Sequence, residues 1–139
     1  MIEKIDAYNY NREAQPFRLD FDGGLLKRGF WIYLWKIRSS DKQVFYYVGR
    51  TGDNSSPNAA SPFGRMSAHF SKNRHGNALL RNLRKEGIDP ATAHYELRTY
   101  GPIFSEQSTF EKHKPLRDLI ASVEESIAQK LKSADFKVI

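Results

Sequence analysis

The central part of the chain alternates between short apolar segments and polar turns, a pattern typical of β-strands. Residues 30–37 (FWIYLWKI) are aromatic or aliphatic at nearly every position, which predicts a strand buried on both faces. Residues 44–48 (VFYYV) predict a second strand, and the polar turn at 38–43 joins the two as a hairpin. Residues 93–100 (AHYELRTY) predict a third strand, which Gly101-Pro102 ends.

The first 28 residues form an N-terminal extension with a weaker pattern. Residues 17–21 (FRLDF) alternate apolar and polar positions, which predicts a short strand, and Asp22-Gly23-Gly24 predicts a turn after it. Asp20 and Asp22 would share one strand face, as a pair of metal ligands can. A turn aspartate is the interpretation that we favour, because aspartate is common in turns.

Two short helices are predicted after the hairpin. Ser61 followed by Pro62 resembles an N-cap and a first helical residue, and this helix should reach about residue 72. Asn77 should cap the second helix, and Gly87 follows its end. The inward-facing positions of this second helix are Leu79, Leu80 and Leu83.

A longer helix closes the chain. Ser108 and Glu111 have the spacing of a capping box, and helical periodicity resumes at Pro115. The apolar stripe that follows consists of Leu116, Leu119, Ile120, Val123, Ile127 and Leu131. Together these elements predict an α+β fold, in which three or more helices flank a small three-stranded, mostly antiparallel sheet.

A carboxylate interrupts the stripe of the last helix. Glu124 lies four residues after Ile120 and three before Ile127, so it falls within or beside the apolar face, whereas Glu125 falls on the solvent side. A buried carboxylate needs compensation, which an arginine or a metal ion could supply. The alternative is a glutamate at the edge of the stripe whose carboxylate reaches water, and periodicity alone favours this alternative.

Composition narrows the class of protein. The chain has 139 residues, no cysteine and a net charge of +6, which predicts one domain over residues 1–139 without disulfides or thiolate metal sites. The longest apolar run is too short to span a membrane, and the N-terminus is too polar for a secretory signal. We therefore expect a cytoplasmic protein with no membrane partner.

The positive charge is concentrated in one segment. Residues 54–85 contain no Asp or Glu but six Lys or Arg residues, a composition that suits contact with phosphates or simply a solvated basic surface. Within it, Arg65 and His69 lie four residues apart on one face of a predicted helix, where both could meet a phosphodiester. Tyr33 and Tyr47, near strand ends, are more often core residues than catalytic ones.

Taken in chain order, the hairpin tyrosines, the arginine and histidine of the first short helix and the glutamate of the last helix resemble the motifs of the GIY-YIG nuclease superfamily. Trp31-Ile32-Tyr33, with Gly29 just upstream, corresponds to the first motif of the family, and Tyr47-Val48-Gly49 to the second. Arg65 and His69 lie where family members carry a helix arginine and, in several branches, a histidine. Glu124 matches the metal-binding glutamate of the family, and the resemblance covers roughly residues 29–131.

Three departures from the family pattern stand out. Trp31 replaces the first glycine, and the loop between Gly49 and Arg65 is longer than usual. The late asparagine expected near Phe136-Lys137 is missing, so activity would be weakened or another residue, such as Asp135, would take its supporting role.

The resemblance implies a Mg²⁺-dependent endonuclease that hydrolyses DNA phosphodiester bonds with one metal ion, for which Mn²⁺ could substitute. It implies that Glu124 binds the metal and that Arg65 stabilises developing negative charge. Tyr33 would be the base, Tyr47 would place the water or a phosphate oxygen, and His69 would orient or relay a proton. The residues expected to contact DNA are Arg50, Lys72, Arg74, Arg81, Arg84 and Lys85.

Two other functions stay open at this stage. One is a DNA-binding module that kept the fold but lost catalysis, and the other is a basic protein-interaction domain. The substrate, duplex or branched DNA, does not follow from the motifs, and neither does assembly into a homodimer or a larger nuclease complex.

Overall fold

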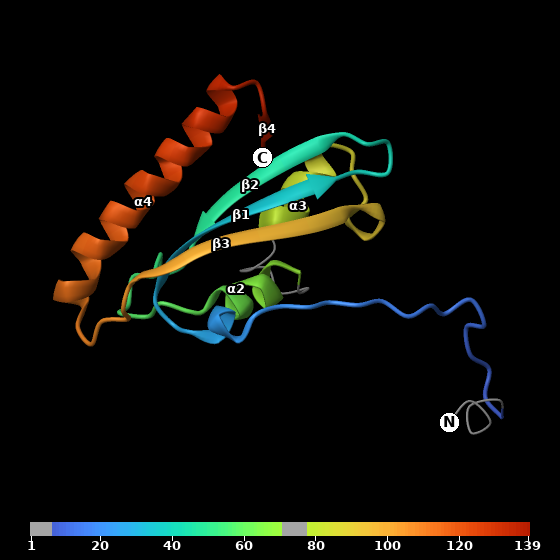
Figure 1. Cartoon of the computed structure of the whole chain (residues 1–139), viewed down its shortest axis with the longest axis horizontal. Coiled ribbons are helices and arrows are strands. Elements are labelled where there is room, and N and C mark those ends of the chain that lie inside the picture. Colours follow the sequence, from blue (N-terminus) through green and yellow to red (C-terminus); the bar gives the residue numbers. More distant parts are fainter. Residues whose placement is uncertain (1–6, 71–77) are drawn as a thin grey trace.

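A mixed four-stranded sheet forms the centre of the fold in the computed structural model, which describes residues 7–70 and 78–139 (Figure 1). The strand order is β3-β1-β2-β4, and three α-helices accompany the sheet within the described residues. The α+β class is therefore as predicted. The predicted number of three strands is wrong, because a short fourth strand pairs with β2.

The hairpin is formed by β1 (Phe30–Arg38) and β2 (Val44–Arg50), which pair antiparallel with Tyr33 opposite Gly49. The turn closes through a hydrogen bond from the Ser39 amide to the Gln43 carbonyl oxygen at 2.9 Å, and Lys42 adopts a φ of 67°. β2 extends two residues beyond its predicted end. Thr51 fixes that end, because its hydroxyl accepts a hydrogen bond from the Trp31 amide at 2.9 Å.

The third strand is longer than predicted. β3 (His94–Phe104) pairs antiparallel with β1 and follows a short 3₁₀ helix, η3 (Pro90–Thr92). It continues through Gly101-Pro102, whose peptide bond is cis, so the prediction that this pair ends the strand is wrong. β3 lies at the edge of the sheet, and its pairing with β1 shifts register between Phe30 and Ile32, so the proline falls at an irregular point of an edge strand, where proline is tolerated.

The fourth strand follows the last helix. β4 (Lys137–Val138) pairs parallel with Phe45 and Tyr46 of β2, and the Ile139 amide donates a hydrogen bond to the Tyr46 carbonyl oxygen at 2.9 Å. Two paired residues carry no alternating pattern that a sequence could reveal. β4 therefore became visible only in the folded chain.

The two short helices lie on one side of the sheet. α2 (Pro62–His69) begins as predicted, with the Ser61 hydroxyl accepting a hydrogen bond from the Gly64 amide at 3.1 Å. It ends at His69, three residues earlier than predicted. α3 (Ala78–Lys85) buries Leu79 and Leu83. Gly87 follows the helix with a φ of 77°, the left-handed conformation that favours glycine, whereas Asn77 lies outside the described residues.

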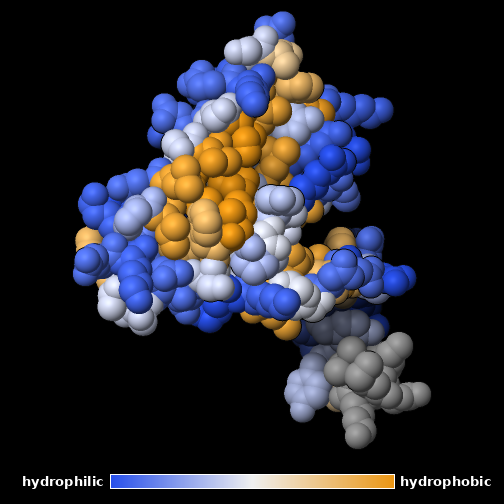
Figure 2. All heavy atoms as spheres, turned by 60° about the vertical axis from the view of Figure 1, so that its left-hand side comes forward, coloured by the Kyte–Doolittle hydropathy of each residue, from blue (hydrophilic) through white to orange (hydrophobic). Residues whose placement is uncertain are grey.

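The last helix, α4 (Phe110–Ser133), is one continuous element that contains Pro115. Its N-cap is Thr109, which accepts a hydrogen bond from the Lys112 amide at 3.3 Å, so the predicted cap at Ser108 is one residue too early. The apolar stripe is only partly covered. Ile120 is buried, but Leu119 and Val123 are exposed. Figure 2, in which the left-hand side of Figure 1 comes forward, shows a hydrophobic patch on that face of the molecule.

The N-terminal residues 7–22 form an extended arm that runs below the sheet and leaves the body of the protein (Figure 1). Residues 17–21 have strand-like alternation but no strand partner, so the predicted strand is absent from this arm. Phe17 is 92% exposed. Asp22-Gly23-Gly24 leads into a 3₁₀ helix, η1 (Gly23–Leu26), and Phe21 contacts Phe63 of α2 with ring centroids 4.8 Å apart.

Alternation along β1 divides the core into two layers. Tyr33, Trp35 and Ile37 pack with α2 and α3, whereas Phe30 and Ile32 pack with α4. Residues 30–33 are buried on both faces of β1, whereas Lys36 is exposed, so the prediction for residues 30–37 is confirmed for the first half of the segment. Within the described part of the chain, no helix is long and apolar enough to cross a membrane.

Candidate functional site

Tyr33 and His69 form a direct contact between the sheet and α2. The Tyr33 hydroxyl oxygen lies 2.6 Å from Nε2 of His69, and both side chains are buried. Gly49, opposite Tyr33 on β2, makes this placement possible, because a β-carbon at residue 49 would coincide with the Tyr33 ring. The glycine of the second motif therefore has a packing function in this structure.

Burial shifts the pKa values of this pair in opposite directions. It raises the pKa of Tyr33 above its ordinary value, and the Arg65 charge only partly offsets this effect. It lowers the pKa of His69 to about 4, with a further decrease from Arg65. Both groups are therefore uncharged at neutral pH. The base role that the resemblance implies for Tyr33 would require a lowered pKa, but burial outweighs the Arg65 charge and raises it.

Tyr47 lies beside the same histidine. The centroids of its ring and that of His69 are 5.5 Å apart, in an edge-to-face arrangement. Burial raises the pKa of Tyr47, while the charges of Arg65 and Glu124 act in opposite directions on it. Tyr47 therefore lies within the electrostatic influence of both the arginine and the glutamate of the predicted site.

Arg65 is held by an acidic residue that the sequence argument did not single out. Its Nη2 lies 2.7 Å from Oδ2 of Asp53, in the loop between β2 and α2, and both side chains are mostly buried. Asp53 is the last acid before the acid-free segment, which is the only sequence signal that could have drawn attention to it. The ion pair fixes the guanidinium next to Tyr33, whose charge interaction with Arg65 alters both pKa values.

Glu124 has an arginine partner, one of the two partners that its position in the stripe predicted. Oε2 of Glu124 lies 2.8 Å from Nε of Arg50 at the end of β2, and the Glu124 side chain is 30% exposed. Burial raises the pKa of Glu124, although the charges of Arg50 and Arg65 act in the opposite direction. Glu125 is exposed, as predicted.

The two halves of the site meet at the edge of β2. β4 covers only Phe45 and Tyr46, so the stretch from Tyr47 to Arg50 has no strand on its outer side within the described residues. A surface recess of about 480 Å³ opens there, and Tyr47, Arg50 and Glu124 line it. Around this open edge, Glu124 of α4 can approach Tyr47, although Tyr47 lies on the opposite face of the sheet.

Buried polar atoms without partners concentrate around this site. Nη1 of Arg50, Oδ1 of Asp53 and Nδ1 of His69 are buried and form no hydrogen bond in the described part of the chain. Such atoms are uncommon in folded proteins, and each one calls for an explanation such as a bound molecule or a functional role. Three such atoms in residues of this site indicate hydrogen-bonding groups that a bound molecule could use.

The predicted DNA-contacting residues are only partly placed. Three of them are exposed on the outer face of α3: Arg81, Arg84 and Lys85. The charge of Arg81 acts to lower the pKa of Tyr47. Arg50 is instead paired with Glu124. Lys72 and Arg74 lie outside the described residues.

The donors at Glu124 fit a hydrated cation better than a closed metal cage. Within the described residues, no group of three or more His, Asp or Glu side chains could enclose a metal ion. A single carboxylate on an open recess suits a hard ion such as Mg²⁺, which keeps several waters and shares phosphate oxygens. Asp135 has a φ of 66° at the end of α4, and no described hydrogen bond or ion pair joins it to this site.

No family model, curated protein or solved structure matches this chain.

Proposed function

We propose that this chain is an endonuclease that hydrolyses DNA phosphodiester bonds with one divalent cation, as its resemblance to the GIY-YIG superfamily implies. The observation that carries the proposal is the convergence of the predicted residues. Tyr33, Tyr47, Arg65, His69 and Glu124 come from β1, β2, α2 and α4, and contacts and charge interactions connect them at one edge of the sheet. Packing alone does not require such a combination of phenols, imidazole, guanidinium and carboxylate.

Phosphate binding is assigned to the two arginines of the site. Arg65 carries five N–H donors, of which Asp53 uses one at Nη2 and Tyr33 interacts with another, so those that remain can bind phosphate oxygens as negative charge develops. Arg50 has an unused buried donor at Nη1. The exposed basic residues of α3 would contact neighbouring phosphates without reading the sequence.

Proton transfer is assigned to Tyr33 and His69 acting together. The neutral Tyr33 hydroxyl gives its proton to Nε2 of His69 while its oxygen accepts a proton from the attacking water. The hydroxide then attacks phosphorus, and the P–O bond to the leaving oxygen breaks. The relay then runs in reverse: His69 returns its proton to the Tyr33 oxygen while the Tyr33 hydroxyl releases its own proton to the leaving oxygen, so the products are a phosphate monoester and an alcohol.

Glu124 is assigned to the metal ion. A divalent cation there would neutralise charge on the phosphate and on the leaving oxygen. Arg50 holds one carboxylate oxygen of Glu124 at 2.8 Å and thereby orients the group toward the recess that it lines.

The direct test is cleavage of a panel of duplex, branched and single-stranded DNA. Each substrate is incubated with the purified protein in Mg²⁺, in Mn²⁺ and with a chelator. We expect metal-dependent nicks or breaks in at least one substrate, which the chelator abolishes. A protein that binds DNA but cuts none of these substrates in either metal would overturn the proposal.

The ion pair of Glu124 with Arg50 favours one other function, a module that binds DNA without cutting it. A carboxylate that an arginine already neutralises attracts a metal ion less strongly. Under this alternative, DNA binding would be unaffected by the chelator, and Glu124→Gln would change neither binding nor cleavage.

A further inference from the structure

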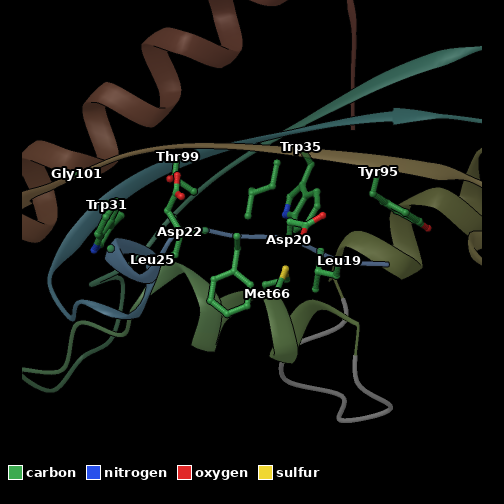
Figure 3. Close-up of a pocket in the computed structure, with 13 residues that line it drawn as sticks. Leu19, Asp20, Asp22, Leu25, Trp31, Trp35, Met66, Tyr95, Thr99 and Gly101 are labelled. Atoms are coloured by element: carbon green, nitrogen blue, oxygen red, sulfur yellow. The ribbon is translucent and has the colours of Figure 1, made fainter. Parts of the chain in front are cut away.

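A second cavity lies between the N-terminal arm and the sheet (Figure 3). It has a volume of about 590 Å³, and we call it the arm pocket. Trp31 and Trp35 of β1 and Met66 of α2 line it from the body of the protein, and Leu19, Asp20 and Asp22 line it from the arm. Most of the lining residues are apolar or aromatic, and two carboxylates stand on the arm side, so the pocket offers both apolar contact and hydrogen bonding to a small organic molecule.

Trp35 supplies an unsatisfied hydrogen-bond donor in this pocket. Its side chain is 4% exposed, and its buried indole Nε1 has no hydrogen-bond partner among the residues that the structure describes. Trp31 provides the contrast, because its Nε1 donates a hydrogen bond to the Lys27 carbonyl oxygen at 3.0 Å. A buried indole N–H normally finds a partner, so the donor of Trp35 is available for an acceptor on a bound molecule.

The carboxylates of Asp20 and Asp22 determine which chemical groups can bind on the arm side of the pocket. Within residues 7–70 and 78–139, Asp20 is paired only with the exposed Arg18, at 2.9 Å, and Asp22 makes no capping hydrogen bond to η1. Exposed ion pairs contribute little, so Arg18 can yield to another donor. Two carboxylates disfavour a phosphate and favour a group that donates hydrogen bonds, such as an amino group.

The arm pocket shares a wall with the candidate catalytic site. Trp31, Tyr33 and Trp35 alternate along one face of β1, and a narrow void beside the pocket is lined by Trp35, Met66, Tyr33 and His69. Arg65 and Met66 are consecutive residues of α2, and Met66 lines the arm pocket, so phosphates bound at Arg65 would lie across this helix from the pocket. A nucleotide near the scissile bond could extend its base toward the pocket while its phosphate stays on the basic side.

We propose that the arm pocket binds an unpaired nucleobase that carries an exocyclic amino group. The base contacts the parts of the tryptophan side chains that line the pocket, Trp35 donates a hydrogen bond to a ring nitrogen or carbonyl oxygen, and Asp22 or Asp20 accepts one from the amino group. The inference rests on the proposed function, since it names an unpaired region of nucleic acid as part of the substrate.

The two tryptophans make the test direct, because the chain has no others and both line the pocket. The full-length protein is titrated with adenosine in the absence of metal, and the two indole N–H signals are followed by ¹⁵N–¹H NMR. Purine riboside, which lacks only the amino group, is the matched probe. We expect the Trp35 signal to shift saturably with adenosine, and purine riboside to bind about threefold more weakly.

Variants separate the contributions of the pocket. Trp35→Phe removes the indole donor but keeps a ring and should weaken adenosine about tenfold, with Trp31 as the reporter. Asp22→Asn is exposed and leaves the core intact, and it should weaken adenosine about threefold. Asp118→Asn, an exposed carboxylate on α4, is the control and should bind adenosine like the wild type.

Three results would overturn the inference: no saturable shift with adenosine, equal binding of purine riboside, or a larger shift with tetramethylammonium, which would mark the pocket as a cage for a cation. Nucleosides carry no phosphodiester bond, and no metal is present. The outcome is therefore independent of whether the protein cleaves DNA, and a failure here is distinguishable from a failure of the nuclease proposal.

Discussion

The Tyr33 hydroxyl lies 2.6 Å from Nε2 of His69, and the two rings, with centroids 5.4 Å apart, connect the central strand to α2. Burial makes the charged form of either group unfavourable, so the pair shares one proton between two neutral groups. The contact therefore joins two uncharged groups at neutral pH, and the proposed proton transfer depends on it.

Protonation of His69 should destabilise the fold at mildly acidic pH. The pKa of His69 is about 4 in the folded protein and near 6.5 in the unfolded chain, so between these values the unfolded chain binds more protons. Stability should therefore decrease as the pH falls from about 6.5 to 4, by up to roughly 1.4 kcal/mol per pH unit from this group. Urea unfolding at several pH values measures it. A His69→Gln variant should show a shallower dependence, and equal slopes would contradict the prediction.

Replacing Glu124 with glutamine should abolish metal-dependent cleavage and leave DNA binding largely intact. The change removes the charge that would hold the cation and frees Arg50, whose guanidinium remains attractive to phosphate. Cleavage rates and DNA affinity are measured side by side. Glu125→Gln is the matched control, because it removes the same charge from the same recess without touching the Arg50 pair. Cleavage by Glu124→Gln at the wild-type rate would show that the glutamate assignment is wrong.

Removing the Arg65 side chain should lower kcat by about 10²–10³-fold, the usual cost of losing one donor to developing oxyanion charge. Because Arg65→Ala also leaves Asp53 without its partner, the thermal unfolding midpoint is measured in parallel. The double variant Arg65→Ala/Asp53→Asn removes both charges and should recover stability without recovering activity. A twofold loss in the stable double variant would exclude the proposed role.

The exposed basic residues of α3 should determine the salt dependence of DNA binding. Changing Arg81, Arg84 and Lys85 together to Gln should reduce the slope of log affinity against log salt by about two to three, if each contacts one phosphate of duplex DNA. The control changes Lys36, Lys112 and Lys130, which are exposed on β1 and α4, and alters net charge equally. Equal slopes for the two triple variants would move the binding face away from α3.

Adding one methyl group at Gly49 should displace Tyr33. A β-carbon there coincides with the Tyr33 ring, so Gly49→Ala should destabilise the fold by about 1–3 kcal/mol and break the contact with His69. Gly64→Ala provides the control, because its β-carbon would lie 3.4 Å from the Ser61 hydroxyl, near ordinary contact, on an exposed helical turn. That variant should be neutral or more stable by up to about 1 kcal/mol. Similar unfolding midpoints for the two variants would contradict this account of Gly49.

Local patterns were sufficient for much of the fold. The aromatic run at 30–37 identified the central strand because both faces of its first half are buried, and Ser61-Pro62 identified the start of α2 because its signal is local. The predicted strand at 17–21 failed for the opposite reason. Its alternation is real, but a strand exists only with a partner, and no neighbouring chain segment pairs with the arm.

The chain's sequence by itself determined the residue types of the candidate site and their order, and it left Glu124 open between a paired carboxylate and one that reaches water. The tertiary structure alone decided that the partner is Arg50, that Asp53 holds Arg65, and that Trp35 faces a pocket with an unused donor. These relationships join residues from separate elements, and no periodicity within one segment encodes them. Burial likewise depends on the whole packed molecule, so the shifted pKa values of Tyr33 and His69 became visible only in the fold.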